Sequence, residues 1–240
     1  MRRREFLALA SLSGWLPFFR PGRISLAGAR FRIVRNGSPQ RRYVLIHGDE
    51  QTARDVLVRH MQTHEGIAYL VESPTRTVPI DSGSIDPNRM FSRAGAAASL
   101  KSLNPAWTPG RIEAALNLLD GGRPKLVHAL FPPRGGLLIA LHNNTDGYSV
   151  SSEEPISDAG SMRDRDNPHA FFLCTDPGDF AILTTSPYNV VLQQHGPKED
   201  DGSLSRLAAA RGARYVNLEV GLGRRDRQED MLAWLEWHLP

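Results

Sequence analysis

Residues whose types suit metal-assisted hydrolysis lie at the end of the first predicted buried strand. His47 follows the apolar run Tyr43–Ile46, whose β-branched and aromatic residues predict a buried strand. Glu50 begins a segment with apolar residues at three- and four-residue spacing, which predicts an amphipathic helix. The tight turn through Gly48 should therefore bring a histidine nitrogen and a carboxylate oxygen together, and these atoms are suitable ligands for one zinc-type ion.

The pattern His-x-x-Glu is common by chance, so its weight depends on two later strands. Gly136–Leu141 is the most hydrophobic predicted strand of the chain, and His142 follows it directly. Glu219 lies near the end of a later predicted strand, Tyr215–Val220. Because sites in open α/β sheets form outside the carboxyl ends of the strands, we expect these side chains to meet the first pair in one crevice.

The four side chains together have the composition of a catalytic metal site. Two histidines and one glutamate leave an open coordination position for water, as in catalytic rather than structural zinc sites. Bound zinc lowers the pKa of that water to about 7 and polarises a carbonyl. Glu219, which is not needed as a ligand, would act as general base and then as acid to the leaving nitrogen. Arg89 is well placed in the sequence to hold substrate or developing negative charge.

Structural roles are the alternatives for the same residues. His142 would then be an ordinary polar residue that ends a strand. Glu219 alternates with apolar neighbours, which is also the pattern of an edge strand with one exposed face. Arg89 would simply anchor its loop. Asp49 is expected to orient His47 or to face solvent rather than to bind metal.

The chain resembles the zinc carboxypeptidases and their relatives, which include the succinylglutamate desuccinylase and aspartoacylase deacylases. The resemblance extends from about Tyr43 to Val220 and depends on an ordered combination of motifs: His47-x-x-Glu50, Asn88-Arg89, His142 and Glu219. It implies a single α/β domain in which a mixed, mostly parallel sheet is sandwiched between helices. It also implies Zn²⁺ as the cofactor.

The resemblance assigns roles to these positions. It implies that His47, Glu50 and His142 bind zinc and that Glu219 activates water.

The resemblance also implies substrate-binding residues, and here the chain departs from the family. Asn88 and Arg89 match the pair that holds a substrate carboxylate, and Arg76 is the candidate for an earlier arginine that stabilises the oxyanion. Carboxypeptidases have a tyrosine in the loop before the catalytic strand, where this chain has Leu192, with Tyr188 nearby. This difference concerns substrate specificity more than hydrolysis itself.

Composition and element order favour one globular domain. The chain has 240 residues, 40% of them hydrophobic and 23% charged, which is enough for a sizeable core. A strand, a helix and a second strand at Ile67–Val71 form a βαβ unit, which predicts a parallel pair in an α/β sheet. Much of the modest net charge of +3 comes from the first two dozen residues, so we expect no nucleic-acid partner. Cys174 is the single cysteine, which excludes an intramolecular disulfide.

The first 29 residues have the pattern of an export signal. Arg3-Arg4-x-Phe6-Leu7 resembles the bacterial twin-arginine signal, and the apolar run up to Phe19 is too short to span a membrane. Ala27-Gly28-Ala29 offers a cleavage site. We therefore predict a signal peptide at 1–29 and a catalytic domain at 30–240. An ordinary secretory signal or a retained anchor is the alternative.

The sequence thus predicts an exported, zinc-dependent hydrolase of bacterial origin that is periplasmic or extracellular. It would use the twin-arginine export machinery and have no membrane contact after signal removal. It would cleave an amide or peptide bond next to a substrate carboxylate, in a small peptide or a cell-wall peptide. Two alternatives stay open: a deacylase acting on an acyl-amino-acid substrate, and a non-catalytic metal-dependent binding protein on the same scaffold.

Overall fold

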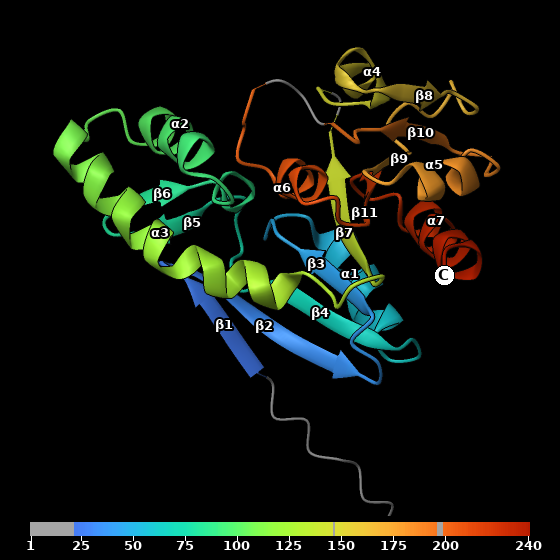
Figure 1. The fold of residues 1–240 in the computed structure, drawn as a ribbon, viewed down its shortest axis with the longest axis horizontal. Helices are drawn as coiled ribbons and strands as arrows, with labels where there is room; N and C mark the ends of the chain where they lie inside the picture. The colour runs from blue at the N-terminus through green and yellow to red at the C-terminus, as the bar shows by residue number, and fades with distance from the viewer. Residues whose placement is uncertain (1–21, 146, 196–198) are drawn as a thin grey trace, which may run out of the picture.

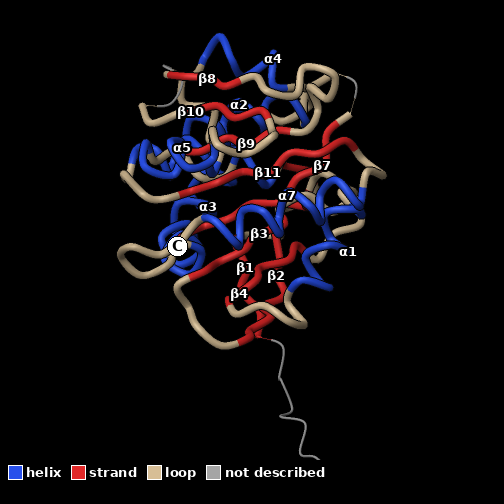
Figure 2. Tube along the Cα trace, turned by 90° about the vertical axis from the view of Figure 1, so that its right-hand side faces the viewer, coloured by secondary structure: helices blue, strands red, loops and turns tan. Residues whose placement is uncertain are grey.

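A mixed sheet forms the centre of the computed structural model, which describes residues 22–145, 147–195 and 199–240. Within these residues the sheet has nine strands in the order β1-β2-β4-β3-β7-β11-β9-β10-β8 (Figures 1 and 2). In chain order the strands are β1 (Gly22–Leu26), β2 (Ala29–Asn36), β3 (Arg41–Leu45), β4 (Gly66–Val71), β7 (Leu137–Asn144), β8 (Ala159–Ser161), β9 (Phe171–Cys174), β10 (Asn189–Leu192) and β11 (Tyr215–Gly221).

The predicted single α/β domain with a mixed sheet is confirmed, and its parallel pairings lie mainly in the middle. Strands β4, β3, β7 and β11 run parallel to their neighbours in this group, and β9 is parallel to β10. The β1–β2, β2–β4, β9–β11 and β8–β10 pairs are antiparallel. The described sheet therefore has four parallel and four antiparallel pairings, so it is less parallel than the sequence indicated.

Helices cover both faces of the sheet, as Figures 1 and 2 show. One face packs against α1 (Gln51–His60), α5 (Pro177–Leu183) and α7 (Arg225–His238). The other packs against α3 (Pro109–Leu130) and α6 (Leu204–Ala210), and α2 (Arg93–Leu103) packs against α3 and β6. Shorter elements complete the fold: the β5 (Val78–Ile80) and β6 (Gly83–Ile85) hairpin, η1 (Pro87–Arg89), α4 (Val150–Glu153) and η2 (Glu154–Ile156).

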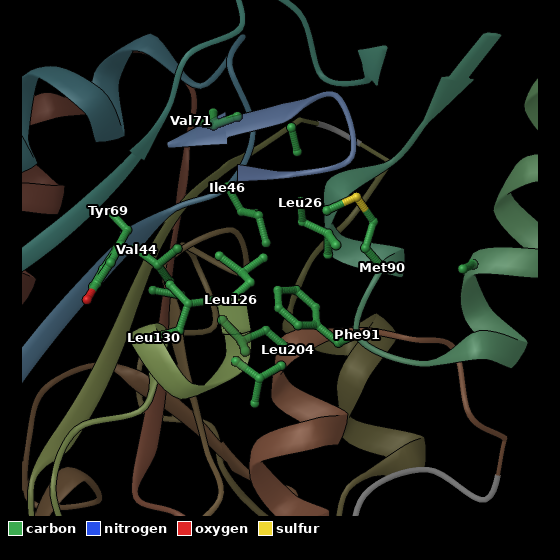
Figure 3. Close-up of a cluster of buried hydrophobic side chains, with 14 of the residues drawn as sticks. Leu26, Val44, Ile46, Tyr69, Val71, Met90, Phe91, Leu126, Leu130 and Leu204 are labelled. Atoms are coloured by element: carbon green, nitrogen blue, oxygen red, sulfur yellow. The ribbon is translucent and has the colours of Figure 1, made fainter. Parts of the chain in front are cut away.

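Strand β3 shows why the central strands are apolar on both sides. Val44 of β3 and Ile46, the residue directly after the strand, pack in the core beneath α3 against Leu126 and Leu130 (Figure 3). The alternate residue Leu45 packs toward α1 and α7. A central strand buried on both faces needs a continuous apolar run, and Tyr43–Ile46 provides it.

Helix α3 is longer than the sequence predicted. The sequence predicts a helix that begins at Thr108-Pro109 and ends near Gly121-Gly122, but the helix continues to Leu130 through Pro124. Leu126 and Leu130 are fully buried, so their burial against the sheet outweighs the low helix propensity of glycine and proline.

The short apolar run Phe180–Leu183 predicts a strand from the sequence, and this prediction is wrong because the segment belongs to α5. The Asp176 side chain accepts a hydrogen bond from the backbone N–H of Asp179, and Pro177 occupies the first turn. A capping aspartate followed by proline is a strong helix start, and it outweighs the β-propensity of a short apolar run.

The predicted boundary after Ala29 falls within the β1–β2 hairpin. Leu26 and Ala29 are buried in the core, and Gly22–Leu26 pairs with β2 along its whole length. The twin-arginine pattern lies in residues 1–21, outside the described part of the chain, so the signal peptide stays a prediction. No helix among the described residues has the length and apolarity that crossing a bilayer requires.

Candidate metal centre

Three buried side chains from three different elements converge at the carboxyl ends of β3 and β7. Glu50 Oε1 lies 2.9 Å from His47 Nδ1 and 3.3 Å from His142 Nδ1. The second oxygen, Glu50 Oε2, lies 3.1 Å from His142 Nδ1. One potential ligand atom from each of the three residues lies within 4.8 Å of those from the other two. The structure therefore brings together the three residues that the sequence predicted as metal ligands.

Local backbone contacts fix the turn that joins His47 to Glu50. The Gly48 N–H donates to the carbonyl of Thr75 at 3.1 Å, and a Cβ at position 48 would lie 2.0 Å from the carbonyl oxygen of Ser73. Only glycine allows this close approach.

The start of α1 is held from β7. Asn143 Oδ1 accepts a hydrogen bond from the backbone N–H of Ala53 at 2.8 Å, which satisfies one of the free donors of the first helical turn. Since Glu50 directly precedes α1, this contact holds its carboxylate beside His142.

Asp86 holds the far side of the His47 ring. Asp86 Oδ1 lies 2.9 Å from His47 Nε2 and also accepts from the Asn88 N–H at 2.8 Å. A carboxylate on one ring nitrogen fixes the proton there and leaves the other nitrogen, Nδ1, as an electron-pair donor. Asp49, the sequence candidate for this role, is exposed to solvent. Asp86 lies 39 residues from His47 in the chain and two before Asn88-Arg89, and no local spacing links it to His47.

Without a metal, the pKa shifts in the site favour a protonated His47 and an ionised Glu50. Burial alone would lower the pKa of His47, but hydrogen bonds to Asp86 and Glu50 and their charges outweigh it and raise that pKa to about 9. Burial raises the pKa of Glu50, and the opposing charges and hydrogen bonds of His142 and His47 bring it down to about 2.

The donor set fits a divalent cation. Among the described residues Glu50 Oε2 has no hydrogen-bond partner although it is buried, so one of its lone pairs is available at the centre of the group. Two imidazole nitrogens and a carboxylate are the ligands of catalytic zinc sites.

Glu219 lies directly opposite His142 in the register of β11 and β7. Its two oxygens accept hydrogen bonds from Asn217 Nδ2 at 3.0 Å and Asn144 Nδ2 at 3.1 Å. Burial raises the pKa of Glu219. The charge of Glu50 acts in the same direction, while His142 and the two amide donors oppose it. Because β11 lies between β7 and β9 and Glu219 is 6% exposed, the edge-strand alternative does not hold.

All seven predicted site residues line one cavity of about 480 Å³. Its walls include His47, Glu50, Arg76, Asn88, Arg89, His142 and Glu219, together with Asp49, Asn144, Tyr148, Glu153, Leu173, Gln193, Asp201, Tyr215 and Asn217.

The arginines lie at the cavity but are already engaged with carboxylates. Arg76 is half exposed, with Nη1 3.5 Å from Glu50 Oε1 and Nε 3.9 Å from Asp86 Oδ2. Arg89 Nη1 lies 2.9 Å from Asp201 Oδ2. A substrate anion would therefore compete with protein carboxylates for both guanidinium groups.

Asn88 is also engaged. Its Oδ1 accepts from the backbone N–H of Leu204 at 3.0 Å, at the start of α6. The substrate-binding roles of Asn88 and Arg89 stay predictions.

Neither Leu192 nor Tyr188 lines the cavity. The Tyr188 ring packs against Phe172, 5.7 Å between centroids, and under the Arg227 guanidinium at 4.6 Å. Phe172 belongs to the sheet face covered by α1, α5 and α7, so Tyr188 does not replace the family's loop tyrosine.

The tyrosines that do line the cavity are Tyr148 and Tyr215. Tyr148, like the neighbouring Glu153, lies in a polar segment with no periodicity or motif spacing. The sequence therefore does not indicate that Tyr148 and Glu153 line the cavity.

No protein-family model and no curated protein matches the sequence.

Several solved structures are similar to this chain in overall fold. A succinylglutamate desuccinylase from Silicibacter sp. TM1040 is 16% identical, with a TM-score of 0.46 over 88% of this chain and 60% of the other. The product-bound ectoine utilization protein EutE (DoeB) from Ruegeria pomeroyi is 14% identical, with a TM-score of 0.44 over 87% and 60%. A candidate metallopeptidase from Shewanella denitrificans OS217 is 13% identical, with a TM-score of 0.47 over 92% and 85%.

The chain thus spans about three fifths of the length of the first two structures and most of the third. At these identities the likeness is one of fold.

Proposed function

We propose that this protein is a zinc-dependent hydrolase that cleaves an amide or peptide bond next to a substrate carboxylate. The observation that carries the proposal is the position of Glu219. It is a buried carboxylate outside the ligand set, held opposite the ligand His142 by strand register. A purely structural or binding metal site has no need of a second, desolvated carboxylate beside the ligands.

His47, Glu50 and His142 would hold the ion, and Asp86 keeps the His47 Nδ1 lone pair directed at it. When bound, zinc supplies a Lewis acid that polarises a carbonyl oxygen and acidifies a water molecule. Three protein ligands leave room for that water.

Glu219 moves the proton. It removes a proton from the attacking water as the hydroxyl oxygen bonds to the acyl carbon, and it then delivers that proton to the nitrogen as the C–N bond breaks. The amides of Asn144 and Asn217 hold one carboxylate oxygen each, which fixes the direction of the transfer. The raised pKa of Glu219 makes it a stronger base than an exposed glutamate.

The arginines bind negative charge. Arg89, next to Asn88, would hold the substrate carboxylate, and Arg76 would stabilise the developing oxyanion. Arg76 suits that role because it is the guanidinium that lies within 3.5 Å of a predicted zinc ligand.

The proposed substrates follow from the proposed place of action. From the sequence pattern of residues 1–29 we propose export to the periplasm or beyond. Small peptides or cell-wall peptides would be the substrates there, and an acyl-amino-acid deacylase is the alternative. Each of these cuts an amide beside a carboxylate and would use the same site residues.

The proposal is tested by zinc content and turnover together. We expect about one zinc per chain in the wild type and in Glu219→Gln, and little in His142→Ala. Against N-acyl-amino acids and short peptides, Glu219→Gln should lose about 10²–10⁴-fold in kcat. His128→Ala, a histidine exposed on α3, is the matched control and should change neither. Folded wild type that binds no zinc would overturn the proposal. Unchanged turnover in Glu219→Gln would overturn the role of the base.

A further inference from the structure

Two buried amide oxygens in the cavity have no hydrogen-bond donor. Asn144 Oδ1 and Asn217 Oδ1 are unpartnered among the described residues, and the two side chains are only 6% and 7% exposed. Leaving such a buried acceptor unsatisfied costs free energy. A ligand that brings N–H donors into the cavity would recover this cost.

The orientation of these amides is fixed by their neighbours. Both Nδ2 groups donate to Glu219, and that of Asn144 donates in addition to the carbonyl of His169 at 2.9 Å. The proposed role of Glu219 as a base requires its ionised form, and an ionised carboxylate and a carbonyl accept but do not donate, so turning either amide would break these bonds. The oxygens are therefore kept as acceptors.

A carboxylate without a cationic partner lies further along the same cavity. Glu153 Oε1 accepts from the Tyr148 hydroxyl at 2.6 Å, and Oε2 accepts from Gln193 Nε2 at 2.6 Å. No Arg, Lys or His in the described ranges forms an ion pair with Glu153. Burial and the charges of Glu219 and Glu153 raise the pKa of Tyr148, so its hydroxyl stays a donor to Glu153.

The strand order separates Glu153 from the metal ligands. His47 follows β3, His142 and Asn144 lie on β7, Glu219 and Asn217 lie on β11, and Gln193, which donates to Glu153, follows β10. The cavity thus passes from the ligands across Glu219 toward Glu153.

The cations of the cavity belong to its other segments. Arg76 precedes β5 and Arg89 lies in η1, and each is already paired with a carboxylate. The end formed by Asn144, Asn217 and Glu153 therefore presents oxygen acceptors and, in Glu153, a carboxylate that has no ion-pair partner within the described part of the chain.

We propose that this end of the cavity binds a primary ammonium group of the substrate, so that the preferred substrate is an amide of a basic amino acid or peptide. An ammonium has three N–H donors and one positive charge, which match two amide oxygens and one carboxylate. A carboxylate or an alkyl group at the same place would leave the oxygens unsatisfied. The inference rests on the proposed hydrolase function, because it specifies that enzyme's substrate.

Matched substrates that differ only in the ammonium test the inference. Acetyl-lysine is compared with acetyl-norleucine, and the dipeptide Lys-Ala with norleucyl-alanine, so that the charge lies on either side of the scissile amide. In zinc-loaded wild type we expect kcat/KM to be at least about tenfold higher for the lysine member of one pair. In Glu153→Gln that ratio should fall toward one, and Glu153→Asp should retain much of it. Glu154→Gln, the same charge change at an exposed neighbour outside the cavity, should leave the ratio unchanged.

Binding separates failure of this inference from failure of the hydrolase proposal. Calorimetry with zinc-loaded Glu219→Gln measures affinity for the same pairs without turnover. Selective binding of the lysine member, lost when Glu153→Gln is added, with no amide cleaved by wild type, would sink the hydrolase proposal and keep the ammonium site. Equal affinities and equal rates within both pairs, or a lysine preference that Glu153→Gln leaves intact, would overturn the ammonium site.

Discussion

His142 and Glu219 face each other on neighbouring parallel strands, as a register pair of β7 and β11. Their separation is set by main-chain hydrogen bonds of the sheet rather than by a loop. Both side chains project from the same face, on which Asn144 and Asn217 also lie two residues along their strands. A predicted metal ligand and a predicted base are therefore held on a rigid support, which favours catalysis because misplacement of reacting groups is costly.

The raised pKa of Glu219 makes metal-free stability depend on pH. Burial raises this pKa, so the folded state binds the proton more tightly than the unfolded chain. The stabilising contribution is complete below the unfolded glutamate pKa and is lost as the pH rises through the folded value. We therefore expect Glu219→Gln to be more stable than wild type at pH 8, with a smaller difference at pH 5.

Urea unfolding of the metal-free proteins at both pH values measures this difference. Glu154→Gln serves as the control for loss of one exposed charge. A gap between wild type and Glu219→Gln that is larger at pH 5 than at pH 8 would contradict the assignment.

Asp86, and not Asp49, should control metal affinity. Removing a carboxylate that orients a ligating histidine typically costs 10–100-fold in affinity, and Asp86 is the carboxylate on His47 Nε2. We expect Asp86→Asn to weaken zinc binding by roughly that factor, as measured by competition with a chromophoric chelator. Asp49→Asn makes the same chemical change at an exposed neighbour of the site and should have little effect. Equal losses in the two variants would remove Asp86 from this role.

The Arg89–Asp201 pair should set the affinity for a substrate carboxylate. Both side chains are more than a third exposed, and such pairs contribute only about 0.2–1 kcal/mol. A substrate carboxylate that replaces Asp201 therefore competes with a weak partner. We expect Asp201→Asn to lower KM by up to about fivefold and Arg89→Ala to raise it by about tenfold or more.

In both variants kcat should change little, because the contact is made equally in the ground and transition states. A substrate whose carboxylate is methylated is the control and should not respond to either substitution. A fall in kcat without a change in KM would place Arg89 in the chemical step instead.

Gly48 should tolerate no side chain. A Cβ at this position meets the carbonyl oxygen of Ser73 at 2.0 Å and that of Thr75 at 2.7 Å, so backbone must move. We expect Gly48→Ala to lower the free energy of unfolding by about 1–3 kcal/mol and to reduce zinc content by separating His47 from Glu50. Gly121→Ala is the matched control, because a Cβ in the middle of α3 meets no atom within 4 Å and should stabilise the helix by about 1 kcal/mol. Normal zinc content in Gly48→Ala would show that the turn is not needed.

The sequence predicted the buried parts of the fold better than the polar ones. Runs such as Tyr43–Ile46 and Gly136–Leu141 have one interpretation, because a central strand covered on both faces must be apolar throughout. His47 and His142 directly follow these two apolar runs, and their ring centroids lie 5.2 Å apart, although β7 itself continues past His142 to Asn144.

The site contacts that the sequence did not indicate join residues that are distant from each other along the chain. Asp86 reaches His47 across 39 positions, and Gln193 reaches Glu153 across 40, so no local spacing reports either contact. The capped turn at Asp176 and the length of α3 show the same limit, since capping and tertiary burial overrode local propensity there.

The order of strands across the sheet also divides the protein's tasks. The metal ligands, the base and the two asparagines of the proposed ammonium site lie on or next to β3, β7, α1 and β11 in the interior of the fold, whereas Glu153 lies on α4 and its partner Gln193 follows β10 near the sheet margin. Insertions, loop exchanges or grafted segments at that margin would leave the interior strands untouched. This architecture would allow selectivity to diverge, in evolution or in engineering, while the bond-breaking apparatus is inherited unchanged.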